Sequence, residues 1–140
     1  MSEDPIRILM VEDNPGDVVL TREALHQAHV PSMLQVVSDG LEALDHLRQA
    51  QANNRLPQLI ILDLNLPRKN GRELLADLNA SPPLDSIPLV VLTSSRVDSD
   101  VLEGCTARRS LYLVKPHSYD DMVEIARTIR DFYDATLTVQ

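Results

Sequence analysis

Short apolar runs recur along the chain, and segments with helical spacing separate them. The runs are rich in Leu, Ile and Val and mostly lack polar alternation; they are residues 6–11, 33–37, 59–62, 87–92 and 111–114. Strands that are apolar on both faces are typical of a parallel sheet that helices cover on both sides. The pattern therefore predicts five buried strands.

The segments between these runs begin with recognisable helix start signals. Asn14 and Pro15 precede the first segment, Asp39 precedes the second, and residues 118–121 (SYDD) precede the last as a capping-box pattern with Asp in the Glu position. The apolar residues expected on the inward faces are Leu20, Ala24, Leu25, Ala28, Ala43, Leu44, Leu47, Ala50, Leu74, Leu75, Leu78, Val101, Leu102, Cys105, Met122, Ile125, Ala126, Ile129 and Tyr133. Strand and helix thus alternate five times, which predicts right-handed βαβ units. The expected fold is α/β, a doubly wound five-stranded parallel sheet with five flanking helices.

Composition fits one globular domain. Of 140 residues, 44% are hydrophobic and 24% charged, and we expect a single domain over 1–140 with a core at about 6–135 and a C-terminal tail at 136–140. A formal charge of −8 disfavours nucleic acid and anionic membranes as partners. The single cysteine excludes an intramolecular disulfide. With neither a basic leader nor an apolar run of membrane length, a cytoplasmic location is expected.

Charged and polar residues follow four of the predicted strands. Glu12 and Asp13 follow the first, Asp63 the third, and Lys115 the fifth, while Thr93 ends the fourth. Because ligands bind beyond the carboxyl ends of parallel strands, we expect these groups to converge. Clustered carboxylates need a positive partner, and Mg²⁺ typically bridges carboxylates to a phosphate. The set therefore predicts a phosphoryl-transfer site in which one acid is the nucleophile.

Each of these residues has a plainer interpretation when taken alone. A single acid at a strand end can be a cap or turn residue, Lys115 can be a solvated charge, and Thr93 can cap a helix. The coincidence of four strand ends favours the functional interpretation. His26 and His29 lie one helical turn apart without a further ligand at metal spacing, so we expect them to be surface residues. Neither a dinucleotide-binding nor an NTP-binding glycine loop is present.

Four motifs occur in order along residues 6–135: VEDNPGD, LDLNLPRKNG, VVLTSS and YLVKP. Together they resemble the receiver domain of bacterial two-component response regulators. The resemblance implies the flavodoxin-like strand order 2-1-3-4-5. More narrowly, EDNPGDVVLTREAL and LPRKNGRELL look like the stand-alone regulators that pair with bacterial phytochrome-type histidine kinases.

The resemblance also implies a role for each site residue. Asp63 would be the phosphoacceptor for a partner sensor histidine kinase, and Thr93 and Lys115 would bind the phosphoryl group. The implied ligands of Mg²⁺, for which Mn²⁺ or Ca²⁺ can substitute, are Glu12, Asp13, Asp63 and the backbone carbonyl of Asn65. The protein would then be a phosphoacceptor signalling protein and not an enzyme.

A switch is implied as well. Thr93 would move toward the phosphoryl group, the Tyr112 ring would follow, and the surface of the fourth helix, fifth strand and fifth helix would change. The peptide bond before Pro116 is expected to be cis. Asn65 and Ser95 would influence hydrolysis of the phosphoryl group.

No output domain is expected after residue 140, so the signal would pass to an unknown downstream target protein or through a homodimer. The motive for the homodimer is that Phe132, Tyr133, Leu137 and Val139 continue past the expected end of the last helix.

Three rival classes remain. A haloacid dehalogenase-type phosphatase also uses a strand-end Asp, Mg²⁺ and a lysine, but it needs a second acid where Asn65 stands. A flavodoxin-like cofactor binder would need a phosphate loop where this chain has EDNPGD. A pseudo-receiver would be an interaction module that takes no phosphate.

Overall fold

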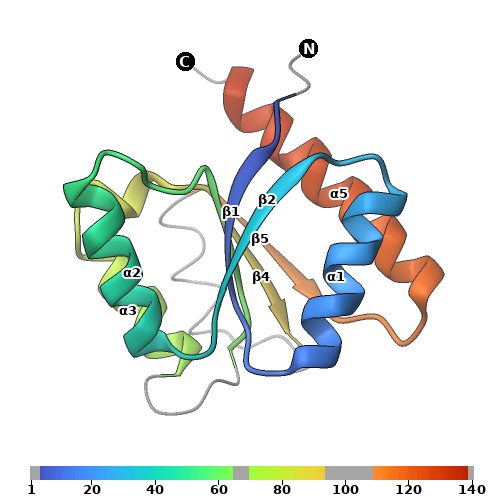
Figure 1. Ribbon diagram of the computed structural model, residues 1–140, viewed down its shortest axis with the longest axis horizontal. Coiled ribbons are helices and arrows are strands. Elements are labelled where there is room, and N and C mark those ends of the chain that lie inside the picture. The colour runs from blue at the N-terminus through green and yellow to red at the C-terminus, as the bar shows by residue number, and fades with distance from the viewer. Residues whose placement is uncertain (1–3, 65–69, 94–108, 139–140) are drawn as a thin grey trace.

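A parallel sheet with the order β2-β1-β3-β4-β5 forms the centre of the molecule (Figure 1). The structure is a computed structural model, and it describes residues 4–64, 70–93 and 109–138. The strands are β1 (Ile6–Val11), β2 (Ser32–Val37), β3 (Leu59–Leu62), β4 (Leu89–Thr93) and β5 (Ser110–Val114). All neighbouring strands pair in parallel. The predicted sheet and its strand order are therefore confirmed.

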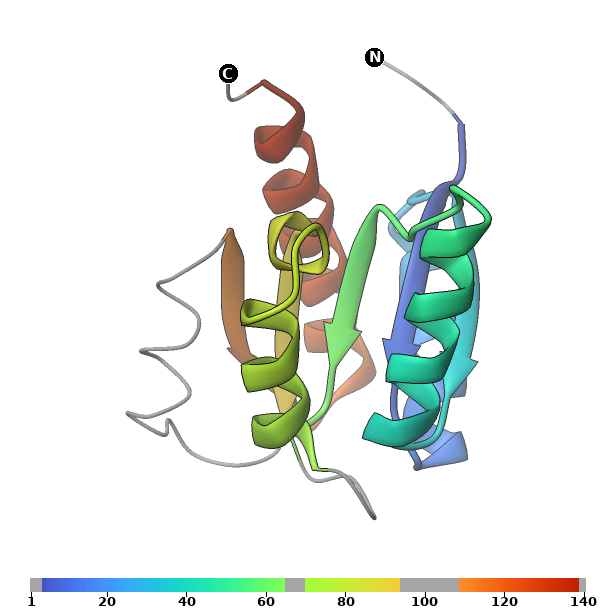
Figure 2. The ribbon, with the colours of Figure 1, turned by 90° about the vertical axis from the view of Figure 1, so that its left-hand side faces the viewer.

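Helices cover both faces of this sheet. In the described residues they are α1 (Pro15–Gln27), α2 (Gly40–Ala52), α3 (Gly71–Asn79) and α5 (Tyr119–Thr138), with a 3-10 turn η1 (Leu84–Ser86) before β4. Figure 2 shows α2 and α3 in front of one face, and Figure 1 shows α1 and α5 against the other. The predicted fourth helix, with Val101, Leu102 and Cys105, lies outside the described residues. None of the described helices is long and apolar enough to cross a membrane.

The predicted helix caps are present. The Asn14 side chain accepts hydrogen bonds from the Gly16 and Asp17 N–H groups at 2.9 and 3.2 Å. Asp39 caps α2, and the Ser118 hydroxyl accepts the Asp121 N–H at 3.1 Å before α5. These side chains satisfy N–H groups that have no partner within the helix, so the sequence alone locates each start. The reciprocal capping box that starts α3, formed by Asn70 and Glu73, was not predicted.

The hydrophobic core lies on both sides of the sheet, and the central strand β3 contributes side chains to each side. All four of its residues are buried. Ile60 and Leu62 join the cluster under α2 and α3, whereas Leu59 and Ile61 join the cluster under α1 and α5. Because successive side chains of a strand point to opposite faces, a central strand covered on both sides must be apolar throughout.

Strand β2 departs from this expectation. Its burial alternates, and Met33 and Gln35 are exposed. The sequence predicted a strand buried on both faces, which is wrong for β2. It lies at the edge of the sheet, and these residues lie on a side that α2 does not cover completely.

The last helix is longer than predicted. Residues 136–138, expected in the tail, continue α5, and an Arg109 guanidinium N–H donates to the Thr136 carbonyl at 3.0 Å. Tyr133 is buried and Phe132 is half-buried against the α1–α5 cluster, whereas Leu137 is 59% exposed. Much of the apolar surface that motivated the homodimer is thus covered by the chain itself. Val139 lies outside the described residues.

The peptide bond before Pro116 is not cis, and the cis bond of the described residues is the one between Pro82 and Pro83. The prediction for Pro116 is therefore wrong. For an X–Pro bond the trans form is favoured by roughly 0.5–1 kcal/mol unless its surroundings select the cis form.

The ends of the described chain lie far from the carboxyl edge of the sheet. Figure 1 shows β1 beginning and α5 ending at the same side of the molecule, opposite the arrowheads of β4 and β5. Residues that follow the strands therefore gather at one edge, away from Ile6 and Thr138.

Candidate functional site

Three carboxylates lie together at the carboxyl edge of the sheet. Glu12, Asp13 and Asp63 each offer one oxygen, and these atoms lie within 4.8 Å of one another. The sheet places them: Val11 pairs with Leu62 in register, so the residues after each strand are neighbours. The Asp63 N–H also donates to the Val11 carbonyl at 3.0 Å. Backbone pairing therefore extends to the residue that the sequence predicts as the phosphoacceptor.

Lys115, which follows β5, closes the cluster. Its Nζ donates to Glu12 Oε1 at 2.8 Å, to Asp17 Oδ2 at 2.7 Å and to Asp63 Oδ2 at 3.2 Å. An ammonium has three protons, so these contacts use its full donor capacity. The predicted convergence of Glu12, Asp13, Asp63 and Lys115 is thus present in the structure.

Asp17 is the residue that sequence reasoning missed. It stands within the VEDNPGD motif, but an acid in the first turn of a helix already has an explanation, because it complements the helix dipole. A signal was available in the predicted fold. The first turn of α1 follows β1 directly, so an acid there lies near the same sheet edge as Glu12.

Burial determines how these groups hold their protons. The Glu12 side chain is 2% exposed, and this burial is the main reason that its pKa is raised to about 7. The Lys115 hydrogen bond opposes the shift, while the nearby Asp63 carboxylate adds to it. Burial alone would lower the pKa of Lys115, but its hydrogen bonds to Asp17 and Glu12 raise it well above the ordinary value. Lys115 therefore stays charged, and its ammonium lies among more carboxyl groups than one positive charge can neutralise.

The donor set fits a hard divalent cation. Glu12, Asp13 and Asp63 offer only carboxylate oxygens, and Asp13 is exposed, so an ion can enter from water with part of its hydration shell. Mg²⁺ prefers oxygen ligands and usually keeps several waters. The negative charge that the clustered carboxylates carry is what such an ion would neutralise. Asn65, whose carbonyl was predicted as a further ligand, lies outside the described residues.

Gly71 holds the backbone that follows Asp63. Its N–H donates to the Leu64 carbonyl at 3.0 Å, and Leu64 is fully buried. A Cβ on Gly71 would lie 2.5 Å from Leu64 Cα and 2.6 Å from the Asp63 carbonyl oxygen. Only glycine permits this approach, so the glycine of the LDLNLPRKNG motif has a packing role at the site.

The structure describes some of the residues predicted to act in the switch and in hydrolysis, and not others. Thr93 ends β4 opposite Val114, at the same edge as Lys115, but its side chain lies outside the described part of the chain. Tyr112 is half-buried and packs against the α2–α3 cluster. Ser95 lies outside the described residues.

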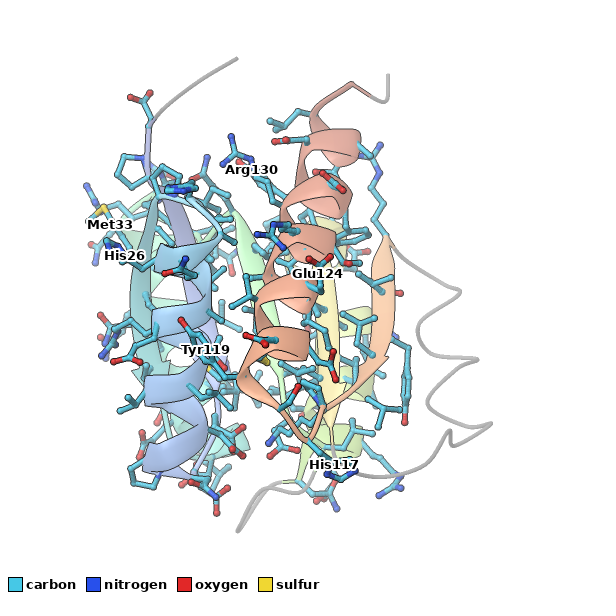
Figure 3. All side chains as sticks on the ribbon, turned by 90° about the vertical axis from the view of Figure 1, so that its right-hand side faces the viewer. His26, Met33, His117, Tyr119, Glu124 and Arg130 are labelled. Carbon is cyan, nitrogen blue, oxygen red and sulfur yellow. The ribbon has the colours of Figure 1, made fainter. Side chains whose placement is uncertain are left out.

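Beyond its first turn, α1 runs away from this cluster. His26 and His29 are exposed, as predicted, and Figure 3 shows His26 near the far end of α1. Tyr119 bridges the two helices, because its hydroxyl donates to the Glu23 carbonyl at 3.4 Å.

The five-stranded parallel sheet carries three carboxylates and a lysine at its carboxyl edge, as the sequence predicts for a receiver domain. Comparison with known proteins supports the same class. Residues 8–127 match the response regulator receiver domain family, and the chain belongs to this family. It is therefore a receiver-type response regulator with a role in a two-component phosphorelay.

Several similar solved structures are phytochrome or bacteriophytochrome response regulators. The chain is 38% identical to response regulator Rcp1 of Synechocystis sp. over 140 residues, covering 99% of this chain and 95% of Rcp1. It is 39% identical to the phosphorylated cyanobacterial phytochrome response regulator RcpA, with a TM-score of 0.81 over 94% of this chain and 96% of that one. The Mn²⁺-bound form of Rcp1 has a TM-score of 0.79 at 38% identity, over 97% and 98% of the two chains.

Proposed function

We propose that Asp63 accepts a phosphoryl group from a partner sensor histidine kinase in a Mg²⁺-dependent reaction. The observation that carries this proposal is the position of the Asp63 carboxylate, which lies 3.2 Å from the Lys115 ammonium and within 4.8 Å of two further carboxylates. Phosphoryl transfer needs a positioned nucleophile and positive charge around the transferred group.

The proposed step is an in-line displacement. A carboxylate oxygen of Asp63 attacks phosphorus, the P–N bond of the kinase phosphohistidine breaks, and the imidazole nitrogen keeps the electron pair. Glu12, Asp13, Asp63 and the Asn65 carbonyl would hold Mg²⁺, or Mn²⁺ or Ca²⁺ in its place, and the ion would supply positive charge that offsets the phosphoryl oxygens. Lys115 and the Thr93 hydroxyl donate hydrogen bonds to those oxygens. A Mn²⁺-bound structure of the similar Rcp1 supports this metal assignment.

The signal is proposed to arise from charge. A phosphoryl group adds about −1.5 to −2 charge at Asp63, which draws Thr93 inward and lets the Tyr112 ring move. The surface formed by β5, α5 and the segment before β5 then changes for a downstream target protein. The protein acts as a signalling component and not as an enzyme on another substrate. Its similarity to RcpA and to the bacteriophytochrome response regulator AtBRR favours a phytochrome-type kinase as the donor, and the reaction is expected in the cytoplasm.

The experiment is phosphorylation by a small donor such as phosphoramidate, with and without Mg²⁺, followed by intact-mass measurement. The wild type should gain one phosphoryl mass only with Mg²⁺, and Asp63→Asn should gain none. Asp120→Asn, which removes an exposed acid at the start of α5, should behave like the wild type. A wild type that gains no mass, or an Asp63→Asn variant that gains the same mass, would contradict the proposal.

Homodimer formation is a second part of the proposal. It is supported by the partial burial of β5 and by Val114 and Leu137, which are large, apolar and exposed. Light scattering at high micromolar concentration, before and after phosphorylation, tests it. A monomer in both states would exclude this part and leave phosphoacceptor function intact.

The lifetime of the phosphoryl group is proposed to depend on Asn65 and Ser95. Ser95 is short and uncharged, so it cannot orient a water for attack. Ser95→Glu should therefore lose the phosphoryl group faster than the wild type. Equal decay of the two phosphoproteins would refute this dependence.

A further inference from the structure

We infer that Asp17 is a positioning residue for Lys115: it retains the ammonium at the rim of the site and so frees Glu12 and Asp63 for the metal ion. The inference rests on the proposed function, since it concerns the same site. It assigns a specific role to a carboxylate outside the predicted set of metal ligands.

The contacts of Lys115 divide into two kinds. Glu12 and Asp63, at 2.8 and 3.2 Å from Nζ, are also proposed metal ligands. Asp17, at 2.7 Å, is not in the carboxylate group that can hold a cation. A divalent ion would repel the ammonium and compete with it for the oxygens of Glu12 and Asp63. Among the three partners, only Asp17 can keep its hydrogen bond unchanged when the metal binds.

The fold fixes Asp17 in this position from two directions. Its N–H donates to the Asn14 side chain at 3.2 Å, which is the cap of α1. Its carbonyl accepts the hydroxyl of buried Thr21 at 2.8 Å. The backbone is therefore held at both ends, and the carboxylate of a rigid first turn faces Lys115. Such a carboxylate is preorganised to hold the ammonium.

Space next to Lys115 permits the proposed rearrangement. A cavity of about 30 Å³ is lined by Asp17, Thr21, Leu92, Lys115, Pro116 and Met122. Open space therefore borders both Lys115 and Asp17, the two groups that stay paired in the proposed rearrangement.

Charge supports the same assignment. The contact of the Lys115 ammonium with the Asp17 carboxylate, at 2.7 Å, is the shortest of its three ion pairs. Without it, the ammonium would depend on Glu12 and Asp63 for hydrogen bonds. It would then occupy the oxygens that a metal ion needs.

The test is calorimetric titration with Mg²⁺ in the absence of a phosphodonor. Asp17→Asn should weaken Mg²⁺ binding by on the order of tenfold, the usual size of an effect from a residue that positions a group at a metal site. Asp120→Asn is the matched control, because it also removes one negative charge near this end of the molecule but has an exposed side chain. Equal weakening by the two variants would mean that only net charge matters and would overturn the inference.

A double-mutant cycle separates action through Lys115 from direct action on the metal. In a Lys115→Gln background, Asp17→Asn should weaken Mg²⁺ binding no more than Asp120→Asn does. A tenfold effect that persists without the lysine would overturn the inference. Thermal unfolding of each variant checks that it is folded. If Asp17→Asn behaves as expected while wild-type Asp63 takes no phosphoryl group, the proposed function fails and the role of Asp17 stands.

Discussion

Two sets of ion pairs in this molecule have opposite surroundings. At the sheet edge, Lys115 joins acids that are 98, 103 and 52 residues away in the chain, and the Glu12 and Asp63 side chains are only 2% and 7% exposed. On α5, Arg127 pairs with Glu124, and their side chains are 53% and 69% exposed. Figure 3 shows Glu124 on the outer surface of this helix.

The difference in burial between the two sets of ion pairs indicates what each contributes to the molecule. Exposed pairs within one helix contribute little to stability and tolerate change. Buried charges are expensive to desolvate, and removing one partner leaves the others uncompensated. A cluster with more carboxylates than ammonium groups is therefore a poor way to stabilise a fold. Its persistence at the sheet edge is explained by the phosphoryl chemistry proposed for it.

The largest effect is expected from Gly71→Ala, which disturbs the backbone that carries the buried set. The added Cβ meets backbone atoms of Leu64 and Asp63 at 2.5 and 2.6 Å, and neither can move without shifting the phosphoacceptor. The free energy of unfolding should fall by about 3 kcal/mol in urea denaturation. Gly16→Ala is the matched control, because its Cβ meets only the Asn14 side chain at 3.2 Å. Similar losses in the two variants would contradict this account.

Mg²⁺ should stabilise the buried set and leave the α5 pairs unaffected. At 100 times its dissociation constant, a ligand that binds only the folded state adds about 2.7 kcal/mol. Thermal unfolding with Mg²⁺ and with a chelator, at matched ionic strength, measures the difference. Asp13→Asn should lose most of the increase, whereas Arg130→Gln should keep it. An increase of the same size in both variants would argue against a metal site at Asp13.

Lys115→Met should destabilise the metal-free protein by about 2 kcal/mol, because several carboxylates lose their shared cation. This figure is below the range for fully buried pairs, since the Lys115 side chain keeps contact with water. Mg²⁺ should restore part of the loss by neutralising the same carboxylates. Urea denaturation with and without Mg²⁺ tests both statements. A variant as stable as the wild type without metal would remove the distinction between the two sets of pairs.

The smallest effect is expected on α5. Arg127→Gln breaks one exposed pair on the helix surface and should change the free energy of unfolding by less than about 0.5 kcal/mol. The same denaturation experiment provides the comparison. A loss above about 1 kcal/mol would show that this exposed pair contributes to stability on the scale of the buried cluster.

The sequence predicted those features that local patterns determine. The apolar residues of β3 and the caps Asn14 and Asp39 are local signals, and the structure has each of them. The convergence of Glu12, Asp63 and Lys115 followed from the rule for parallel sheets, because the rule depends on topology alone.

The features that were missed depend on tertiary packing. The Asp17 contact depends on where α1 lies relative to β5, which no local pattern reports. The exposure of Met33 depends on how far α2 covers an edge strand. The helical conformation of residues 136–138 depends on contacts such as that of Arg109 with Thr136. The isomer of the Pro116 bond was carried over from a family resemblance, and the structure has the other one.

Because β1 begins and α5 ends on the side opposite the site, a fluorescent reporter or a surface tether attached beyond either element lies away from Asp63. A chain immobilised in this way presents its acidic edge outward to a kinase in solution. Fusion proteins built for imaging or for kinase assays can thus use either end without covering the phosphoacceptor.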